Sequence, residues 1–328
     1  MTNTTPGGNT YKAAIAKALL DGMSAHPKSF IMGQDIGSFS ILGVTEGLAE
    51  RFGAERVRDC PISESAMVGM AVGAAMKGWV GLLEIAYSDI TAVAFSSIVH
   101  SAAKMRYATG GQLPCPVIIR APILRWSRHG PMGTEVTASW YCNVPDLAIA
   151  MPATPAEAYW QLLAAFTRPV PTLILEDRAL FAEEGLIGEA YDVEKARVLR
   201  AGTDLTLVAA GRPVKLAMDA AVQLAAAGVS AEVLSLGHVK PFDRDGLLAA
   251  AKRTGRVLVI QDEPPFGGYG VIAMAALAEL APGTLACAPK LLCRADTFLP
   301  HLLEEDHLPT VDAVIRAART LTQAQAQA

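Results

Sequence analysis

The sequence predicts an α/β protein of two doubly wound domains in tandem, each with a mostly parallel sheet between layers of helices. Short apolar runs alternate with longer amphipathic runs, which is typical of strands that alternate with covering helices. At 328 residues the chain exceeds the size that one hydrophobic core usually supports. A charged stretch at 187–202 interrupts the alternation, so we expect a linker there between domains at 1–186 and 203–328.

The elements of the first domain follow from this alternation. Mostly apolar runs predict buried strands at 29–33, 56–59, 80–86, 115–120, 147–151 and 171–176. Helices are expected between them at 11–25, 45–52, 66–77, 89–107 and 155–166. The last helix has the clearest start, because Thr154 can act as its N-cap, Pro155 suits its first turn and Glu157 completes a capping box.

The second domain repeats the pattern. Strands are expected at 205–210, 231–236, 256–261 and 284–292. Helices are expected at 213–227, 244–252, 270–280 and 311–321. The alternation again favours a parallel sheet with helices on both faces.

Composition excludes several classes of protein. A net charge of −4 without a basic run argues against nucleic-acid binding. The sequence has no apolar run of the roughly 20 residues that a membrane span needs, and no secretory leader at its start. The five cysteines lack CxxC spacing, which favours free thiols over a metal site or disulfides. We therefore expect a cytoplasmic protein without metal ligands of its own.

One segment carries the strongest indication of chemistry. A strand ends at Asp59, Pro61 breaks it, and Glu64 opens the next helix. Glu64 should thus lie at the carboxyl end of a parallel strand, where α/β sheets bind ligands. A plain alternative is that Glu64 only stabilises the first turn of that helix. Gly69 and Gly73 on the same helix allow close approach of another backbone, within the domain or from another subunit.

Several motifs carry a resemblance to a known family. Residues 30–181 resemble the β subunits of pyruvate, branched-chain 2-oxoacid and acetoin dehydrogenases, and residues 203–320 resemble their C-terminal domain. The two domains would then be a transketolase-like pyrimidine-binding domain and a transketolase C-terminal-like domain. The matching stretches are Gly33-Gln34-Asp35-Ile36-Gly37, Arg56-Val57-Arg58-Asp59, Pro61-Ile62-Ser63-Glu64, Ala71-Val72-Gly73-Ala74-Ala75-Met76, Glu84-Ile85-Ala86-Tyr87-Ser88-Asp89, Gly110-Gly111-Gln112, Lys240-Pro241-Phe242-Asp243 and Gly267-Gly268-Tyr269-Gly270.

The resemblance implies a cofactor, thiamin diphosphate. In the family, the glutamate at the position of Glu64 hydrogen-bonds N1′ of the aminopyrimidine ring and so promotes loss of the thiazolium C2 proton. Tyr87 lies where the family has an aromatic against the aminopyrimidine, although a tyrosine can also simply fill this strand-to-helix corner. Ile62 of the same motif is expected to contact the cofactor.

The other half of such a site is absent from this sequence. Family enzymes hold the diphosphate through Mg²⁺ bound by a GDG motif and an asparagine, and this chain has no GDG run. In two-subunit members the motif lies on the α subunit. The resemblance therefore implies an α2β2 heterotetramer in which this chain is active only with its α subunit.

The sequence departs from the family near the substrate. The family histidine of a Gln-His-Ser triplet falls on Gly133, and His129 is the candidate to replace it. Arg125 and Arg128 could pair with a substrate carboxylate or lie on a solvated loop. His100 stands at a family asparagine, where it could approach the cofactor or the α subunit, or have a structural partner on its helix.

A second departure concerns a potassium site that many family members have. Arg168 and Val170 occupy the positions of its aspartate and asparagine. The arginine charge could replace the ion, so we do not expect potassium to bind here.

Three functions remain open from the sequence. The first is decarboxylation of a 2-oxo acid, or cleavage of an acyloin, with transfer of the acyl group to lipoamide on a lipoyl acyltransferase partner. The second is a thiamin-dependent carboligase or non-oxidative decarboxylase subunit, which the loss of histidine at Gly133 favours. The third is a non-catalytic assembly subunit, against which the retained Glu64 and Tyr87 argue.

Overall fold

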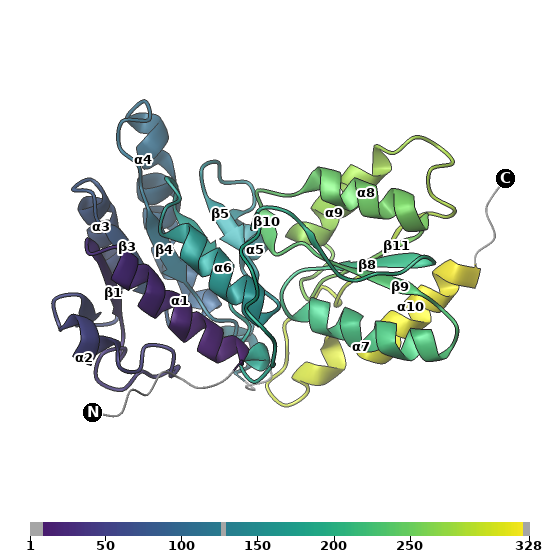
Figure 1. Cartoon of the computed structure of the whole chain (residues 1–328), viewed down its shortest axis with the longest axis horizontal. Helices are drawn as coiled ribbons and strands as arrows, with labels where there is room; N and C mark the ends of the chain where they lie inside the picture. Colours follow the sequence, from purple (N-terminus) through teal and green to yellow (C-terminus); the bar gives the residue numbers. More distant parts are fainter. Residues whose placement is uncertain (1–8, 126–128, 324–328) are drawn as a thin grey trace.

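Two sheets organise the computed structural model, which describes residues 9–125 and 129–323 (Figure 1). Among these residues, seven strands form the first sheet. Their order is β10 (His238–Lys240), β5 (Ala148–Ala150), β6 (Thr172–Ile174), β4 (Val117–Arg120), β3 (Val80–Glu84), β1 (Ser29–Gly33) and β2 (Val57–Asp59). All neighbours are parallel except β10 and β5, so the carboxyl ends of six strands meet at one edge.

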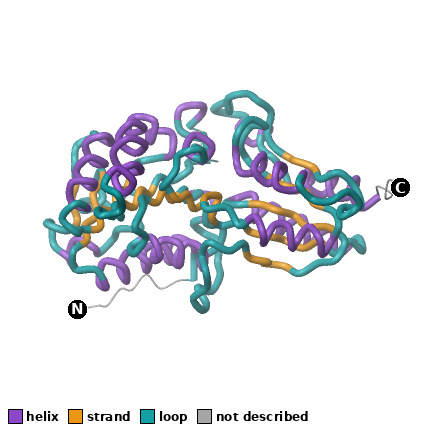
Figure 2. The backbone as a smooth tube through the Cα atoms, turned by 90° about the horizontal axis from the view of Figure 1, so that it is seen from above, coloured by secondary structure: helices purple, strands orange, loops and turns teal. Residues whose placement is uncertain are grey.

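Helices cover both faces of this sheet, as Figure 2 shows. On one face α1 (Tyr11–Ala25) packs against α6 (Pro155–Ala165), and α3 (Glu64–Ala75) and the π-helix η2 (Ser97–Ala102) cover the other. The shorter helices are α2 (Leu48–Phe52), η1 (Ser88–Ala94), α4 (Ala103–Ala108), η3 (Gly130–Met132), α5 (Ala138–Tyr141) and η4 (Arg178–Leu180). Thr154 caps α6 as predicted, its Oγ1 accepting a hydrogen bond from Glu157 N at 3.2 Å.

The second sheet has the order β12 (Lys290–Leu292), β11 (Val257–Ile260), β8 (Leu205–Ala209), β9 (Ala231–Ser235) and β7 (Arg197–Arg200). On one face lie α7 (Arg212–Ala226) and α10 (Val311–Gln323), and on the other α8 (Arg244–Thr254) and α9 (Gly268–Ala278). The short η5 (Glu304–His307) precedes α10. Buried residues of α8 and α9 share one hydrophobic core with those of α3, so the core continues from one half to the other. None of the described helices is long and apolar enough to cross a bilayer.

The boundary between the halves differs from the predicted linker. Part of 187–202 is β7, an antiparallel edge strand beside β9. Its arginines are partly exposed, and an edge strand with polar side chains lacks the apolar run that predicts a buried strand. In addition, β10 follows β9 directly and pairs with β5 of the first sheet, His238 lying opposite Ala150. The two halves are therefore joined by strand pairing as well as by packing.

The structure also differs from the predicted helix at 89–107 and from the predicted strand at 284–292. The helix divides into the 3₁₀-helix η1, the π-helix η2 and α4, each with its own hydrogen-bonding pattern. The strand is limited to β12 at its C-terminal end. Apolar periodicity locates such segments, but it does not distinguish one kind of helical turn from another.

Arg120, at the carboxyl end of β4, joins three strands through ion pairs. Its Nη1 lies 2.5 Å from Glu84 Oε2 at the end of β3, and its Nη2 lies 2.5 Å from Glu176 Oε2 just after β6. The guanidinium is fully buried. Burial alone would lower the pKa of Arg120, but the carboxylates of Glu176 and Glu84 raise it above its ordinary value. The arginine therefore stays charged between them.

Further acidic groups are buried where the halves meet. Asp177 and Glu263 line a small cavity together with Arg212, Asp262 and Tyr269. Burial raises the pKa of Asp177 to about 7, and burial likewise raises the pKa of Glu263 to about 7. The charge of Arg212 opposes the rise in the pKa of Asp177 only in part, and hydrogen bonds from Ser139 do the same for Glu263. The interface thus contains carboxyl groups that change protonation near neutral pH.

Replacing Arg120 by methionine is expected to lower the free energy of unfolding by about 3–5 kcal/mol, because two buried carboxylates lose their partner. Urea denaturation of the purified chain measures the change. The control is Arg244→Met, which breaks an exposed pair with Glu279 and should cost less than about 1 kcal/mol. Equal losses in the two variants would contradict the importance given to Arg120.

Asp177→Asn is expected to stabilise the chain more at pH 8 than at pH 5. The pKa of Asp177 is raised from its ordinary value of 3.8 to about 7 in the folded state, so wild-type stability is fully present only below the ordinary pKa and is lost as the pH rises from there to about 7. Asparagine cannot ionise and avoids this loss, which should amount to about 1 kcal/mol or more between the two pH values. Denaturation at both pH values tests this, with the exposed Asp245→Asn as control. A pH-independent difference would contradict it.

Candidate functional site

Glu64 lies at the carboxyl edge of the first sheet, as predicted from the sequence. It follows β2 as the first residue of α3, and it is 4% exposed. No residue in 9–125 or 129–323 donates a hydrogen bond to its carboxylate or forms an ion pair with it. Burial, with the charges of Asp59 and Glu64, raises the pKa of the nearby Cys60 thiol. Glu64 is thus a buried acceptor that the described part of the chain leaves available.

Tyr87 occupies the corner that follows β3 at the same edge. Its backbone is extended and its side chain is half-buried. The next residue fixes this corner, since Ser88 N donates to Pro122 O at 2.9 Å. The first turn of α3 is tied to η1 by Ser65 Oγ, which donates to Val93 O at 2.7 Å. Strand β1 alone separates β2 from β3, so Glu64 and Tyr87 lie at the ends of two strands with one between them.

Other residues of this edge are accessible. Ile62 is 82% exposed, directly before the Ser63–Glu64 helix start. On α3, a Cβ added to Gly69 or Gly73 would meet no atom within 4 Å. The small face predicted for this helix is therefore open, and does not pack within the described chain.

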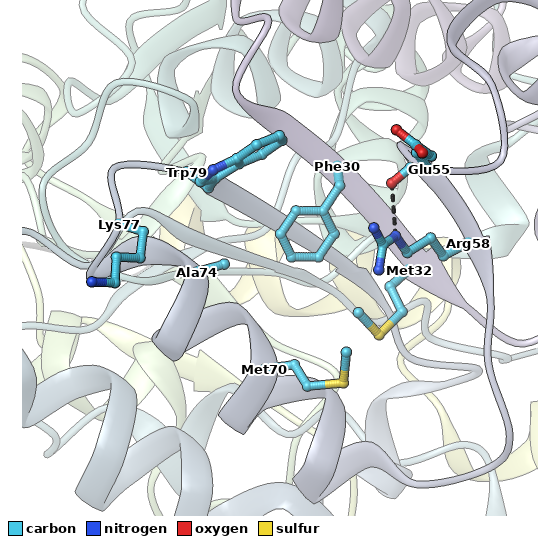
Figure 3. Close-up of a pocket in the computed structure, with 8 residues that line it drawn as sticks. All are labelled: Phe30, Met32, Glu55, Arg58, Met70, Ala74, Lys77 and Trp79. Atoms are coloured by element: carbon cyan, nitrogen blue, oxygen red, sulfur yellow. Dashed lines mark hydrogen bonds between the residues drawn. The ribbon is translucent and has the colours of Figure 1, made fainter.

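A cavity of about 270 Å³ lies beside α3 but contains none of the predicted site residues (Figure 3). Its lining combines apolar side chains with charges at the rim, from Phe30, Met32, Glu55, Arg58, Met70, Ala74, Lys77 and Trp79. Arg58 is turned toward the residues that precede its own strand, because its Nε donates to Glu55 O at 2.7 Å. Met70, on the same helix as Glu64, is 54% exposed. The cavity extends the open surface of α3.

His129 and Gly133 lie against each other in the loop after β4. His129 is exposed, and a Cβ added to Gly133 would lie 2.9 Å from its Cβ and 3.4 Å from its Cγ. The φ of Gly133, −164°, is one that any residue adopts. Glycine is required here for space, because His129 occupies the volume into which a side chain at 133 would point.

The predictions for the two loop arginines, Arg125 and Arg128, must be considered separately. Arg128 lies outside the described residues. Arg125 is 1% exposed, and its Nη1 lies 3.2 Å from Asp262 Oδ2 of the second half. A solvated position is therefore wrong for Arg125, whose guanidinium has a buried carboxylate partner within the chain. The pairing with a substrate carboxylate stays a prediction.

His100 and Arg168 both have partners within the chain. Nδ1 of His100 lies 3.0 Å from Lys104 Nζ one turn further along an exposed helix face. This matches the alternative of a structural helix partner. Arg168 Nη1 lies 2.5 Å from Glu194 Oε1. In the described residues, no group of three His, Cys, Asp or Glu side chains is arranged to hold a metal ion.

Sequence reasoning assigned no role to Asp89 or Glu135, which connect Tyr87 to the loop of His129. Asp89 Oδ1 accepts from Glu135 N at 3.0 Å, and Ser88 Oγ donates to Glu135 O at 2.5 Å. Burial, and then the charge of Glu135, raise the pKa of Asp89 to about 6. Asp89 belongs to a recognisable motif, but its partner lies 46 residues away, so only the structure identifies the pair.

Comparison with known families agrees with this arrangement. The family model described as the pyrimidine binding domain of transketolase matches residues 8–183 of the 328, and the transketolase C-terminal domain matches residues 194–314. A solved structure described as a split-gene transketolase in an inactive β4 tetramer has a TM-score of 0.81 and 24% identity. It covers 97% of this chain and 100% of its own. The fold class predicted from the sequence is thereby confirmed.

Curated relatives are similar over almost the whole chain. The pyruvate dehydrogenase E1 component subunit beta-1 of Arabidopsis thaliana is 32% identical, covering 94% of this chain and 88% of its own. The acetoin:2,6-dichlorophenolindophenol oxidoreductase subunit beta of Cupriavidus necator is 32% identical, with coverages of 94% and 96%. The 3-methyl-2-oxobutanoate dehydrogenase subunit beta of Mycobacterium tuberculosis is 33% identical, with coverages of 93% and 90%. The chain belongs to the family of pyruvate, branched-chain 2-oxoacid and acetoin dehydrogenase β subunits.

Proposed function

We propose that this chain is the β subunit of a thiamin diphosphate-dependent enzyme that decarboxylates a 2-oxo acid, or cleaves an acyloin, and transfers the acyl group to lipoamide. The observation that carries the proposal is Glu64, a buried carboxylate without a described partner at the carboxyl edge of the sheet. Carboxyl groups are rarely buried without a hydrogen-bond partner, so this one suits a ligand that supplies such a partner.

Glu64 and Tyr87 would hold the pyrimidine end of the cofactor, with Ile62 beside them. The Glu64 carboxyl group would donate a hydrogen bond to N1′ of the aminopyrimidine and thereby favour the tautomer that can remove a proton. The Tyr87 ring would provide a flat apolar surface, and the Ser88–Pro122 bond keeps its corner in place. When bound, thiamin diphosphate supplies a nucleophilic carbon and an acceptor for the electrons released on decarboxylation.

The partner is proposed to be an α subunit that carries the GDG motif and asparagine for Mg²⁺ and the diphosphate, in an α2β2 assembly. The open face of α3 supports such a partner, because Gly69 and Gly73 leave room for another backbone and Met70 is exposed. The domain at 1–186 would face the cofactor. The domain at 203–328 would hold the 1–186 domain in place. The free cysteines support the proposed cytoplasmic location.

A second function is supported by one observation, the glycine at position 133. A carboligase or non-oxidative decarboxylase subunit needs thiamin diphosphate but not transfer to lipoamide. Co-expression with the α subunit, followed by a screen of 2-oxo acids with lipoamide or an artificial electron acceptor, separates the two functions. Turnover that depends on lipoamide supports the first function, and product formation without an acceptor supports the second.

Glu64→Gln is expected to reduce 2-oxo acid turnover of the co-expressed pair by a factor of about 10²–10⁴, because an amide cannot replace the carboxyl group in proton transfer. Turnover is measured with added thiamin diphosphate and Mg²⁺. Glu50→Gln, on the exposed surface of α2, is the matched control and should leave turnover unchanged. Full turnover of Glu64→Gln would instead support a non-catalytic assembly subunit.

His129→Gln is expected to slow acyl transfer by a factor of about 10² if His129 replaces the family histidine as a proton donor or acceptor. Acyl transfer by Gly133→His alone should also be slow, because the new side chain at 133 collides with His129. The double variant His129→Gly/Gly133→His removes the collision and should recover at least tenfold over His129→Gln. An unchanged rate in His129→Gln would exclude a direct role for this histidine.

A further inference from the structure

Two buried arginines connect the second half of the molecule to the segment at 129–135. Arg125 lies in the loop that follows β4, and Arg294 follows β12 of the second sheet. Both are nearly excluded from solvent, at 1% and 4% exposure. Buried guanidinium groups are stable only where carboxylates and carbonyls satisfy them, so their partners identify what the arginines hold together.

Asp262, just after β11, is the common anchor of the two arginines. Its backbone oxygen accepts from Arg125 Nη2 at 3.2 Å and from Arg294 Nε at 3.1 Å. Its Oδ2 lies 3.2 Å from Arg125 Nη1 and 3.9 Å from Arg212 Nη1. Glu263 adds a contact from the same turn, where its Oε1 accepts from Ser139 N at 3.2 Å.

The other ends of the arginines reach neighbouring residues of the loop. Arg125 Nε donates to Thr134 O at 3.0 Å, and Arg294 Nη2 pairs with Glu135 Oε2. Thr134 Oγ1 in turn donates to Gly130 O at 2.7 Å. The segment that contains His129 and Gly133 is therefore closed on itself and fixed to the second half at two successive residues.

The same segment is bonded on its far side to the corner of Tyr87. Glu135 N donates to Asp89 Oδ1 at 3.0 Å, and Glu135 O accepts from Ser88 Oγ at 2.5 Å. A continuous series of polar contacts thus runs from Asp262 through Arg125 to Thr134 and through Arg294 to Glu135, and from Glu135 to the residues after Tyr87. Each link is buried or partly buried, where hydrogen bonds to charged groups are strong.

We propose that Arg125, Asp262, Arg294 and Glu135 are positioning residues through which the second half fixes the 129–135 segment, and with it His129, beside the Tyr87–Asp89 corner. The kinetic consequence rests on the proposed function, whereas the fixing of the segment does not. A misplacement of about 1 Å in a catalytic group can cost a factor of 10² in rate. The four residues should therefore affect turnover without touching substrate or cofactor.

The test uses Arg125→Met and Glu135→Gln in the full chain co-expressed with its α subunit. Glu135→Gln removes the ion pair to Arg294 but retains both backbone bonds of residue 135, so it remains informative if Arg125→Met fails to fold. In each variant, amide hydrogen exchange in peptides covering 129–136 should become about tenfold faster. The kcat should fall about tenfold, while the Kd for thiamin diphosphate should change less than twofold. Arg125→Lys should recover only part of the kcat, since one ammonium cannot bond Thr134 and Asp262 as a guanidinium does.

Arg253→Met is the matched control, because Arg253 pairs with the buried Glu232 at 2.9 Å entirely within the second half. It should leave both the exchange of 129–136 and the kcat unchanged. Unchanged exchange and kcat in the two test variants would overturn the proposal. So would a parallel loss of kcat, cofactor affinity and stability that Arg253→Met reproduces, because this would indicate general destabilisation. If wild type shows no thiamin-dependent turnover, the proposed function fails, and the exchange of 129–136 alone decides whether the segment is fixed in this way.

Discussion

The ion pairs of Arg120 determine where the rest of the site can lie. This side chain fixes the carboxyl ends of β3, β4 and β6 relative to one another by bonding Glu84 and Glu176 in a fully buried position. The backbone supports the same alignment, since Ile85 N donates to Arg120 O at 2.9 Å and Ile123 N donates to Glu176 O at 2.8 Å. Burial raises the pKa of Glu84, although the opposing charge of Arg120 lowers it. The arrangement is therefore stable only when all three groups are present.

Each strand held by Arg120 leads into a different part of the candidate site. The residues after β3 carry Tyr87, those after β4 lead to Arg125 and His129, and those after β6 place Asp177 at the boundary with the second half. A parallel sheet brings these strand ends to one edge. The ion pairs then hold the strand ends at fixed positions relative to one another. Glu64 reaches the same edge from β2, two strands away from β3. The site is thus assembled from strand ends, although its residues are far apart in sequence.

The sequence predicted the features that depend on local pattern. Apolar runs located most of the strands, and the motif around Glu64 and Tyr87 identified their place at the sheet edge. The sequence did not predict β7 and β10, because an edge strand with partly exposed arginines and a three-residue strand leave no apolar run to detect. Nothing in the sequence indicated that Arg125 is buried. Its partner Asp262 lies 137 residues away, and only the packing of the two halves brings them together.

Arg125, His129 and Gly133, in the 125–135 region, are physically connected. Gly133 has no side chain, and His129 occupies the volume into which a side chain at 133 would point. The observed position of His129 is therefore compatible only with glycine at 133. A glycine also increases the conformational freedom of a loop, which would reduce the accuracy with which it places a catalytic group. Arg125 opposes this effect, because its bond to Thr134 O, one residue after Gly133, restrains the backbone at that point. Since Arg125 is itself held by Asp262, the position of the loop depends on the second half of the chain. Substitution of the histidine, the glycine or the arginine therefore has consequences for the other two.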